Sequence, residues 1–165
     1  MFFALFISLF FLVGFGLLGW GLYSMYRGQQ ARSWPRVPGS IVDCQIKQNS
    51  DGEGGTTWHV EVRYKYQVAG KDFESDRVAF GYVGSSSYDE HRAIHEKLMQ
   101  AKQVEVKHDP DDSAIAVLAA GVNRSTILIL VFALTWLLFT TGFTVLWYYS
   151  QGRDNRILEQ IRVLK

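Results

Sequence analysis

The chain has 165 residues, a formal net charge of +1, 48% hydrophobic residues and 20% charged ones. Its central stretch, residues 27–125, carries 13 Lys and Arg against 14 Asp and Glu, which excludes a nucleic-acid-binding protein because phosphates reward a basic face. The single cysteine, Cys44, excludes an internal disulfide and a cysteine-based zinc site, and we expect it to be a small buried residue on a strand.

The first predicted element is a transmembrane helix over residues 2–26. It contains no charged side chain, and 14 of its 25 residues are Leu, Ile, Val or Phe. At ~1.5 Å per residue it would reach roughly 37 Å, enough to cross a ~30 Å hydrocarbon core with some tilt. Trp20, Tyr23 and Tyr26 gather at one end, as interfacial aromatic residues do. A basic start is missing and the apolar run is too long for a signal peptide, so we expect an uncleaved helix.

Three glycines in this segment, Gly14, Gly16 and Gly19, form the pattern G-x-G-x-x-G. A dinucleotide-binding fingerprint needs a preceding strand and a following helix, but here the glycines lie inside one apolar span. We interpret them as positions of close helix packing, because glycine lets backbones approach. Gly14 and Gly21 lie on nearly one face. Packing against the second span is the natural use of that face, and a homodimer seam is the alternative.

Residues 27–39 are predicted to be a linker, because Pro35 and Pro38 disfavour a helix. Trp34, inside this linker, would either lie at the membrane surface or cap the domain that follows. That domain is predicted to be soluble and rich in β-strands, and it covers residues 40–120.

The clearest strand of this domain is Thr57–Val68, where apolar and polar residues alternate over twelve positions. A shorter strand is predicted before it at Ile41–Gln48, with an apolar face made of Val42, Cys44 and Ile46. A tight turn then leads to a hairpin partner at Asp72–Phe80. Acidic residues of this partner strand would form surface pairs with basic residues of the long strand: Glu74 and Asp76 with Arg63 or Lys65.

A helix is predicted at about Tyr88–Ala101, because Ser87 and Glu90 form a Ser-x-x-Glu capping box at its start. Four residues would face the sheet: Tyr88, Ile94, Leu98 and Ala101. Short strands are expected at Val104–His108 and Ala114–Leu118. The predicted fold class is therefore α+β, with two transmembrane α-helices flanking a small antiparallel β-rich domain with one helix.

The second transmembrane helix is predicted over residues 126–149, which are 24 uncharged residues. Its hydroxyl side chains would bond to their own helix or to a partner helix: Thr135, Thr140, Thr141 and Thr144. Residues 151–165 read as a basic amphipathic tail that would lie on an anionic membrane or dock on a partner, with a frayed end as the alternative. Basic residues flank the loop side and the terminal side four against four, so their distribution leaves the orientation open.

His91 and His95 share a helix face at a spacing that suits a zinc pair. The glutamate that a zinc hydrolase needs directly after the first histidine is replaced by Arg92, so we interpret both as ordinary helix histidines. The acidic turn of Asp109, Asp111 and Asp112 lacks the longer pattern of a calcium loop and is expected to be a solvated turn. No G-x-S-x-G nucleophile motif occurs. The sequence therefore predicts no catalytic, cofactor-binding or metal-binding residue.

Several short motifs resemble those of one known family. These are Trp34-Pro35-x-Val37-x-Gly39-x-Ile41 after an apolar helix, a Tyr-x-Tyr strand that ends at Gly70, and Val104-x-Val106-x-His108-Asp109-Pro110 before a second apolar helix. Over roughly residues 15–150 the chain resembles the bacterial membrane protein family of domain of unknown function 3592. Members of that family commonly have Tyr-Tyr-Asn-Pro where this chain has Val106-Lys107-His108-Asp109-Pro110. The resemblance implies a bacterial cell membrane and no assigned activity.

We therefore expect a non-enzymatic interaction or scaffold protein, multi-pass in a bacterial inner membrane. Its partners would be the lipid bilayer and a protein bound through the β-rich domain or the tail, with no nucleic acid and no cofactor; the transmembrane glycines allow a homo-oligomer. A small membrane-anchored hydrolase or metal-dependent enzyme is the alternative. A channel or transporter subunit is less favoured, because neither span contains an ionisable side chain.

Overall fold

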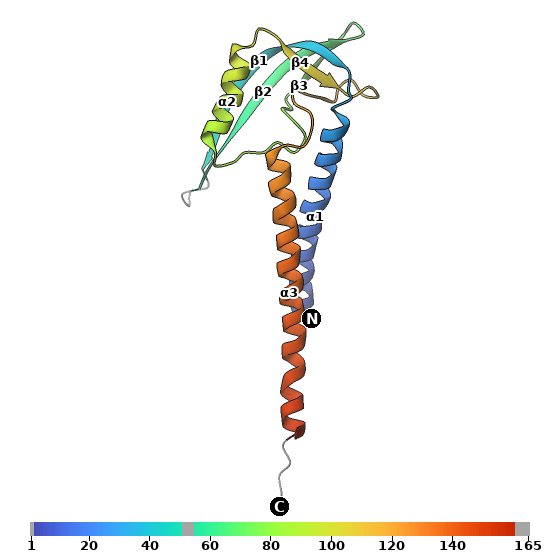
Figure 1. Ribbon diagram of the computed structural model, residues 1–165, viewed down its shortest axis with the longest axis vertical. Coiled ribbons are helices and arrows are strands. Elements are labelled where there is room, and N and C mark those ends of the chain that lie inside the picture. Colours follow the sequence, from blue (N-terminus) through green and yellow to red (C-terminus); the bar gives the residue numbers. More distant parts are fainter. Residues whose placement is uncertain (1, 51–54, 161–165) are drawn as a thin grey trace, which may run out of the picture. The chain divides into compact units, whose positions relative to one another are not determined.

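The computed structural model describes residues 2–50 and 55–160. Over these ranges the chain forms, in order, α1 (Phe2–Gln30), β1 (Arg36–Ser50), β2 (Thr56–Val68), β3 (Lys71–Ser75), α2 (Tyr88–Gln100), β4 (Val104–His108), β5 (Ala116–Val117) and α3 (Arg124–Gln160) (Figure 1). The chain divides into two compact units. The helical unit contains α1 up to Trp20 and α3 from Ile129 onward, and the sheet unit is Gly21–Leu128.

Two helices are long and apolar enough to cross a membrane, Phe3–Gln30 and Arg124–Gln151. Only 6% and 17% of their most apolar stretches are buried, whereas the core helices of a water-soluble protein would be mostly covered. Large apolar side chains such as Leu12 and Leu138 are 70% and 74% exposed. The predicted fold class, with apolar helices on both sides of a sheet domain, is confirmed.

In the helical unit, α1 and α3 pack closely at Gly14. A Cβ built there would lie 2.5 Å from the Leu137 side chain, so only glycine fits without a shift. Nearby, the Trp136 indole N–H donates to the Phe10 carbonyl oxygen at 2.9 Å and the two rings stack. The interpretation of Gly14 as a packing position against the second span is confirmed. A Cβ at Gly16 or Gly19 would meet nothing within 4 Å.

Hydroxyl groups in α3 bond to their own helix. Thr140 Oγ1 donates to the Trp136 carbonyl oxygen at 2.8 Å, and Thr135 and Thr144 make the same bond four residues back. Helix α3 runs without a break from Arg124 to Gln160. The second span and the tail that was predicted to begin at Gln151 are therefore parts of one continuous helix. The last part of the predicted tail, residues 161–165, lies outside the described residues.

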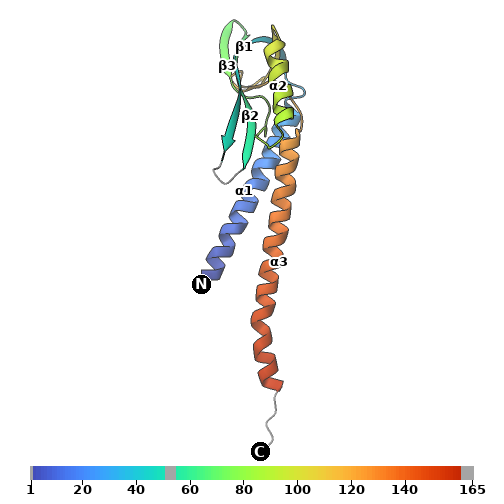
Figure 2. The ribbon, with the colours of Figure 1, turned by 90° about the vertical axis from the view of Figure 1, so that its left-hand side faces the viewer.

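The five strands form one antiparallel sheet in the order β3-β2-β1-β4-β5, and Figure 2 shows α2 on one face of β1 and β2. The predicted alternation of β2 is confirmed, because Val60, Val62, Tyr64 and Tyr66 are all buried. Ile94 and Leu98 of α2 pack against this core as predicted. Tyr88 also faces the sheet, since its ring packs edge-on against Trp58 of β2 with 4.8 Å between ring centroids, although the residue is 41% exposed. Glu74 pairs on the surface with Arg63 and Lys65 as expected.

A β-bulge changes the predicted face of β1. The register with β2 shifts between Ile41 and Asp43, which leaves Val42 as the extra residue. Val42 is therefore 46% exposed instead of sharing the apolar face with Cys44, which is buried as expected. An alternating pattern cannot reveal this shift, because one inserted residue moves its neighbours to the opposite face.

Other boundaries also differ from the prediction. Residues 27–30 are the last turn of α1 and residues 36–39 begin β1, so the linker is shorter than predicted. Pro38 is tolerated in β1 because pairing with β2 starts only at Gly39. Strand β3 ends at Ser75, since the next segment turns away and the Val78 carbonyl oxygen accepts the N–H groups of Leu118 and Ala119 instead.

The predicted capping box of α2 is wrong. Ser87 occupies the N-cap position but makes no side-chain hydrogen bond to the helix. Glu90, the other half of the predicted box, contacts Arg124 at 3.5 Å instead. The start of α2 is thus tied to the start of α3 within the sheet unit.

Candidate functional site: an open edge of the sheet

The outer half of β1 has one side without a strand partner. Its neighbour on that side, β4, pairs only with Arg36–Gly39, whereas β1 continues to Ser50. Over residues 43–50, β1 is therefore hydrogen-bonded only to β2 in the described part of the chain. Such an edge presents unpaired backbone N–H and C=O groups in a row.

The register identifies which backbone groups of β1 point outward. The N–H and C=O of Trp58 in β2 both bond to Ser85, on the side of β2 away from β1, at 2.8 and 3.0 Å. Residues opposite each other in an antiparallel ladder share the same bonding state, so Gln48, which lies opposite Trp58, points its own N–H and C=O away from β2. Because the pattern repeats every second residue, Ile46 and Cys44 do the same. We call the outward groups of Cys44, Ile46 and Gln48 the open edge.

Few side chains near the open edge would prevent another strand from pairing with β1. Lys47 is exposed, and its ammonium group lies 3.5 Å from Glu61 on the neighbouring strand, so its charge is partly neutralised. A lysine on an edge strand usually discourages strand addition, and this ion pair weakens that protection. The bulge at Val42 ends the regular edge on the inner side.

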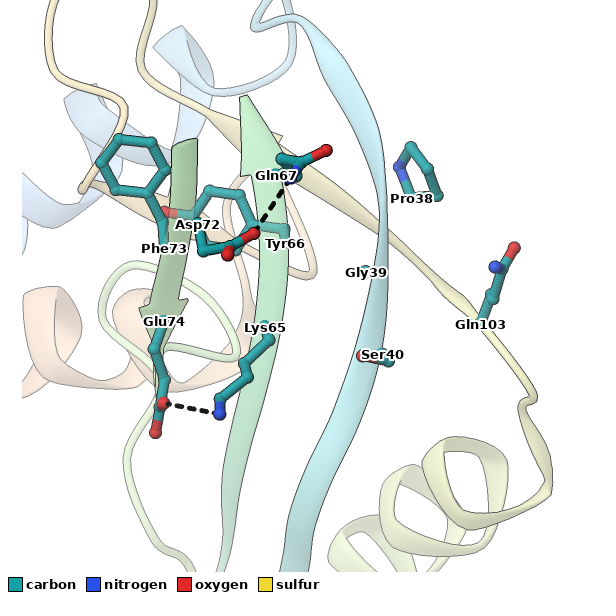
Figure 3. A pocket seen from close by; sticks show the side chains of 10 residues that line it. All are labelled: Pro38, Gly39, Ser40, Lys65, Tyr66, Gln67, Asp72, Phe73, Glu74 and Gln103. Carbon is teal, nitrogen blue, oxygen red and sulfur yellow. Dashed lines mark hydrogen bonds and ion pairs between the residues drawn. The ribbon is translucent and has the colours of Figure 1, made fainter. Parts of the chain in front are cut away.

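The outer face of the sheet contains a shallow polar cavity of about 590 Å³, shown in Figure 3. Two side-chain pairs cross its floor: Gln67 donates to Asp72 at 3.1 Å, and the Lys65 ammonium lies 3.9 Å from Glu74. Ser40 of β1 and Gln103 lie at its other end. Lys65 is paired with Glu74, and Asp72 accepts only from the neutral Gln67, so the lining has one positive and two negative side chains. The cavity therefore has no positive charge left to select an anionic ligand.

A second cavity, of about 530 Å³, follows the opposite edge of the sheet beside β2. It lies between β2 and the segment that connects β3 to α2, and Tyr82 Oη accepts a hydrogen bond from the Val60 N–H at 3.0 Å at its side. Acidic and basic residues alternate around it: Asp43, Glu61, Asp76, Arg63 and Arg77. The connecting segment already covers this edge, which leaves the β1 side as the open one.

A buried polar cluster joins the connecting segment to α2. His91 is 3% exposed, its Nδ1 lies 2.7 Å from Tyr82 Oη, and its Nε2 lies 2.9 Å from Ser85 Oγ. Burial lowers the pKa of His91, so the ring is neutral near pH 7. The sequence interpretation placed His91 on the helix correctly but missed both partners, which are brought to it only by the fold.

The distance between Ser85 and His91 is within the range of a nucleophile and its base. The hydrogen bonds fit either tautomer of the ring. Nε2 lies 3.2 Å from the Ser85 N–H, and Ser85 Oγ accepts the Ser87 N–H, so its own hydrogen is free to point at Nε2. Tyr82 Oη accepts the Val60 N–H and can either donate to Nδ1 or accept from it. Both ring nitrogens are occupied by neighbouring groups and the residue is 3% exposed, so we interpret His91 as a structural residue that holds the connecting segment to α2.

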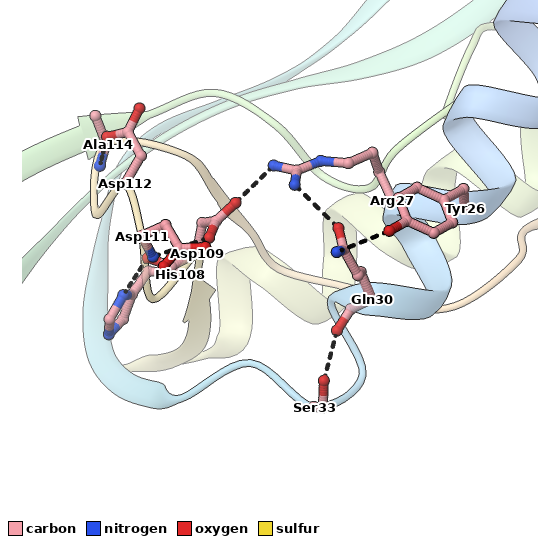
Figure 4. A network of polar contacts seen from close by, with 9 residues as sticks. All are labelled: Tyr26, Arg27, Gln30, Ser33, His108, Asp109, Asp111, Asp112 and Ala114. Carbon is pink, nitrogen blue, oxygen red and sulfur yellow. Dashed lines mark hydrogen bonds and ion pairs between the residues drawn. The ribbon is translucent and has the colours of Figure 1, made fainter.

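The end of α1 is held to the sheet by an ion pair. Arg27 Nη2 lies 2.7 Å from Asp109 Oδ2, and the two side chains are 16% and 9% exposed (Figure 4). The guanidinium lies over the rings of Trp34 and Phe80 at 5.0 and 5.3 Å. Burial alone would raise the pKa of the Asp109 carboxyl, but the Arg27 guanidinium and the Asp111 and Asp112 backbone N–H groups lower it below its usual value. Asp109 is thus not the solvated residue that the sequence suggested.

Backbone contacts complete this attachment. The Gly121 N–H donates to the Gly28 carbonyl oxygen at 2.7 Å, and a Cβ on Gly28 would overlap the Gly121 carbonyl group. Asn123 caps α3 by accepting the Thr126 N–H at 2.9 Å, while its amide donates to the Phe80 carbonyl oxygen at 2.6 Å. We call this region, from the Arg27–Asp109 pair to the Asn123 cap, the joint. Trp34 is buried in it at 6% exposure and so caps the domain.

No group of three or more His, Cys, Asp or Glu residues that could hold a metal ion occurs within residues 2–50 and 55–160. His95 is half-buried on the same helix as His91, and the ring nitrogens of His91 are both engaged by Tyr82 and Ser85. This arrangement of His91 and His95 does not support the alternative of a metal-dependent enzyme.

The fold and the open edge define a class of protein: a membrane-associated chain in which two apolar helices flank an antiparallel α+β domain with one unpaired strand edge. The family model for Domain of unknown function (DUF3592) matches residues 37–123, more than half of the chain. The chain belongs to this family, and the match covers the sheet domain without either apolar helix. No curated protein and no solved structure matches the chain.

Proposed function

We propose that this chain is a non-enzymatic interaction protein of a bacterial cell membrane, in which the β-rich domain of residues 40–120 binds a partner protein. The partner would add an extended segment to the open edge of β1. The observation that carries the proposal is the row of outward backbone groups at Cys44, Ile46 and Gln48. Strand addition satisfies such groups directly, and alternate side chains of the added segment supply specificity.

The joint supports this function mechanically. A sheet tied to the end of α1 by a buried ion pair and close glycine contacts keeps a fixed orientation relative to that helix end. A partner bound at the open edge would therefore meet a sheet that is already held in one arrangement with this helix end. Preorganisation of this kind reduces the entropy lost on binding.

Gln48 allows a matched test. Its N–H points away from β2, so Gln48→Pro removes an outward donor without breaking a ladder bond, whereas Gln48→Ala removes the side chain and keeps the donor. A photoreactive amino acid at Lys47, expressed in the native cells, would report a bound partner. We expect a discrete cross-linked product that persists with Gln48→Ala and is lost with Gln48→Pro.

A photoreactive residue at Lys71, the first residue of β3, is the positional control and should give no such product. Cross-linking that is indifferent to Gln48→Pro, or equal from Lys71, would contradict strand addition at this edge.

A further inference from the structure

The start of α2 lies at the same end of the sheet unit as the start of α3, the helix whose apolar stretch begins at Arg124. The Ser125 hydroxyl donates to the Val83 carbonyl oxygen at 3.4 Å, and the Arg124 guanidinium lies 3.5 Å from Glu90. The segment from Val83 to Glu90 is therefore level with the first turn of α3. That turn already exposes large apolar side chains, with Ile127 at 52%.

Apolar and aromatic side chains are exposed at this level of the sheet unit. Val83 is 37% exposed and Tyr88 is 41% exposed, and the half-buried Trp58 ring packs edge-on against Tyr88 with 4.8 Å between ring centroids. Tyr23 and Tyr26 of α1, 57% and 62% exposed, provide further aromatic residues near the end of that helix. Amphipathic rings at the ends of apolar helices are typical of the headgroup region.

We propose that Trp58, Val83 and Tyr88 form a membrane-contact patch through which the sheet domain rests on the headgroup region of the bilayer that α3 enters. Continuity with the first turn of α3 is the reason for choosing lipid as the occupant. The patch would add a third attachment to the membrane besides the two helices, independent of any partner at the open edge. It would fix the tilt of the sheet domain over the lipid surface.

The charges around the patch indicate which lipids it suits. Asp89 and Glu90 lie in the first turn of α2, where Glu90 contacts Arg124 at 3.5 Å and Asp89 interacts electrostatically with Arg92. Two carboxylates against two guanidinium groups leave no excess of positive charge to attract an anionic surface. The contact is therefore an aromatic insertion into the interface of a zwitterionic bilayer, without attraction to negative headgroups.

Spin labels can measure this contact in the full chain. We would replace Cys44 by alanine, introduce single cysteines as Val83→Cys, Tyr88→Cys or Met99→Cys, attach a nitroxide and reconstitute each variant in phosphatidylcholine vesicles. Met99 is the control because it is also an exposed apolar residue of α2, 59% exposed, but about eleven residues or ~16 Å farther along the helix. The readout is the ratio of collisions with oxygen, which concentrates in lipid, to collisions with a water-soluble nickel chelate.

We expect this ratio to be several-fold higher at positions 83 and 88 than at position 99. Equal ratios at all three positions would overturn the proposal. A second measurement needs no label: lipids brominated near the headgroup should quench part of the tryptophan fluorescence, and Trp58→Phe should remove a part of that quenching. Unchanged quenching in the Trp58→Phe chain would also overturn the membrane-contact patch, whereas neither result bears on cross-linking at Lys47.

Discussion

The joint and the open edge handle polar groups in opposite ways. At the joint, a buried guanidinium meets a carboxylate at 2.7 Å, and the Gly121 N–H, the Asn123 amide and the Thr126 N–H all have partners. At the open edge, alternate backbone groups of β1 face outward with no strand beside them in the described part of the chain. Paired groups resist change and unpaired groups invite a partner, so the first region fixes orientation and the second offers a binding edge.

The largest expected effect is at the ion pair of the joint. Asp109→Asn leaves the largely buried Arg27 without its carboxylate, and Arg27 Nε already has no hydrogen-bond partner. We expect a loss of about 3 kcal/mol in the free energy of unfolding, measured by denaturant titration of the full chain in detergent micelles. Asp111→Asn, an exposed residue of the same turn, is the control and should change it by less than about 0.5 kcal/mol. Equal effects of the two substitutions would show that the joint does not depend on this pair.

A glycine pair in α1 gives the next comparison. Gly28→Ala would force the Gly121 backbone to shift, which should cost about 1–3 kcal/mol in the same titration. Gly19→Ala makes the same chemical change in the same helix, at a place where a Cβ meets nothing within 4 Å. We expect it to leave the free energy of unfolding unchanged. Should Gly19→Ala be the more damaging of the two, α1 would have a contact at Gly19 that this single chain lacks.

The buried His91 cluster predicts a dependence of stability on pH. Burial lowers the pKa of His91 in the folded chain below the unfolded value of 6.5, so the unfolded state binds more protons between these two values. The free energy of unfolding should therefore fall as the pH drops from 6.5 toward the folded pKa of His91. This contribution to the pH dependence should be absent in the His91→Gln chain. An identical pH profile for both chains would contradict the neutral, buried assignment of His91.

The smallest effect is expected at the open edge. Gln48→Pro removes no ladder bond and Gln48 is exposed, so the free energy of unfolding should change by less than about 0.5 kcal/mol. The same substitution at Lys47, whose N–H points toward β2, should be clearly more destabilising. A large loss from Gln48→Pro would mean that this edge is already paired in the free protein.

Local patterns predicted the parts of the fold that depend on one segment. The alternation of β2, the span of α2 and both apolar helices follow from periodicity and composition alone. The bulge at Val42 was missed because it is a feature of pairing between strands, and the capping box failed because Glu90 bonds to Arg124 instead. The features of the candidate site depend on distant segments: Ser85 and Tyr82 meet His91 through the fold, and Arg27 and Asp109 are separated by 82 residues.

Hydrogen exchange of single amides in β1 tests the open edge most directly. The N–H groups of Gln45 and Lys47 point toward β2, whereas those of Ile46 and Gln48 point outward. In the isolated full chain we predict slow exchange at Gln45 and Lys47 and much faster exchange at Ile46 and Gln48. Uniform protection of all four amides would contradict an unpaired edge and, with it, the proposed mode of binding.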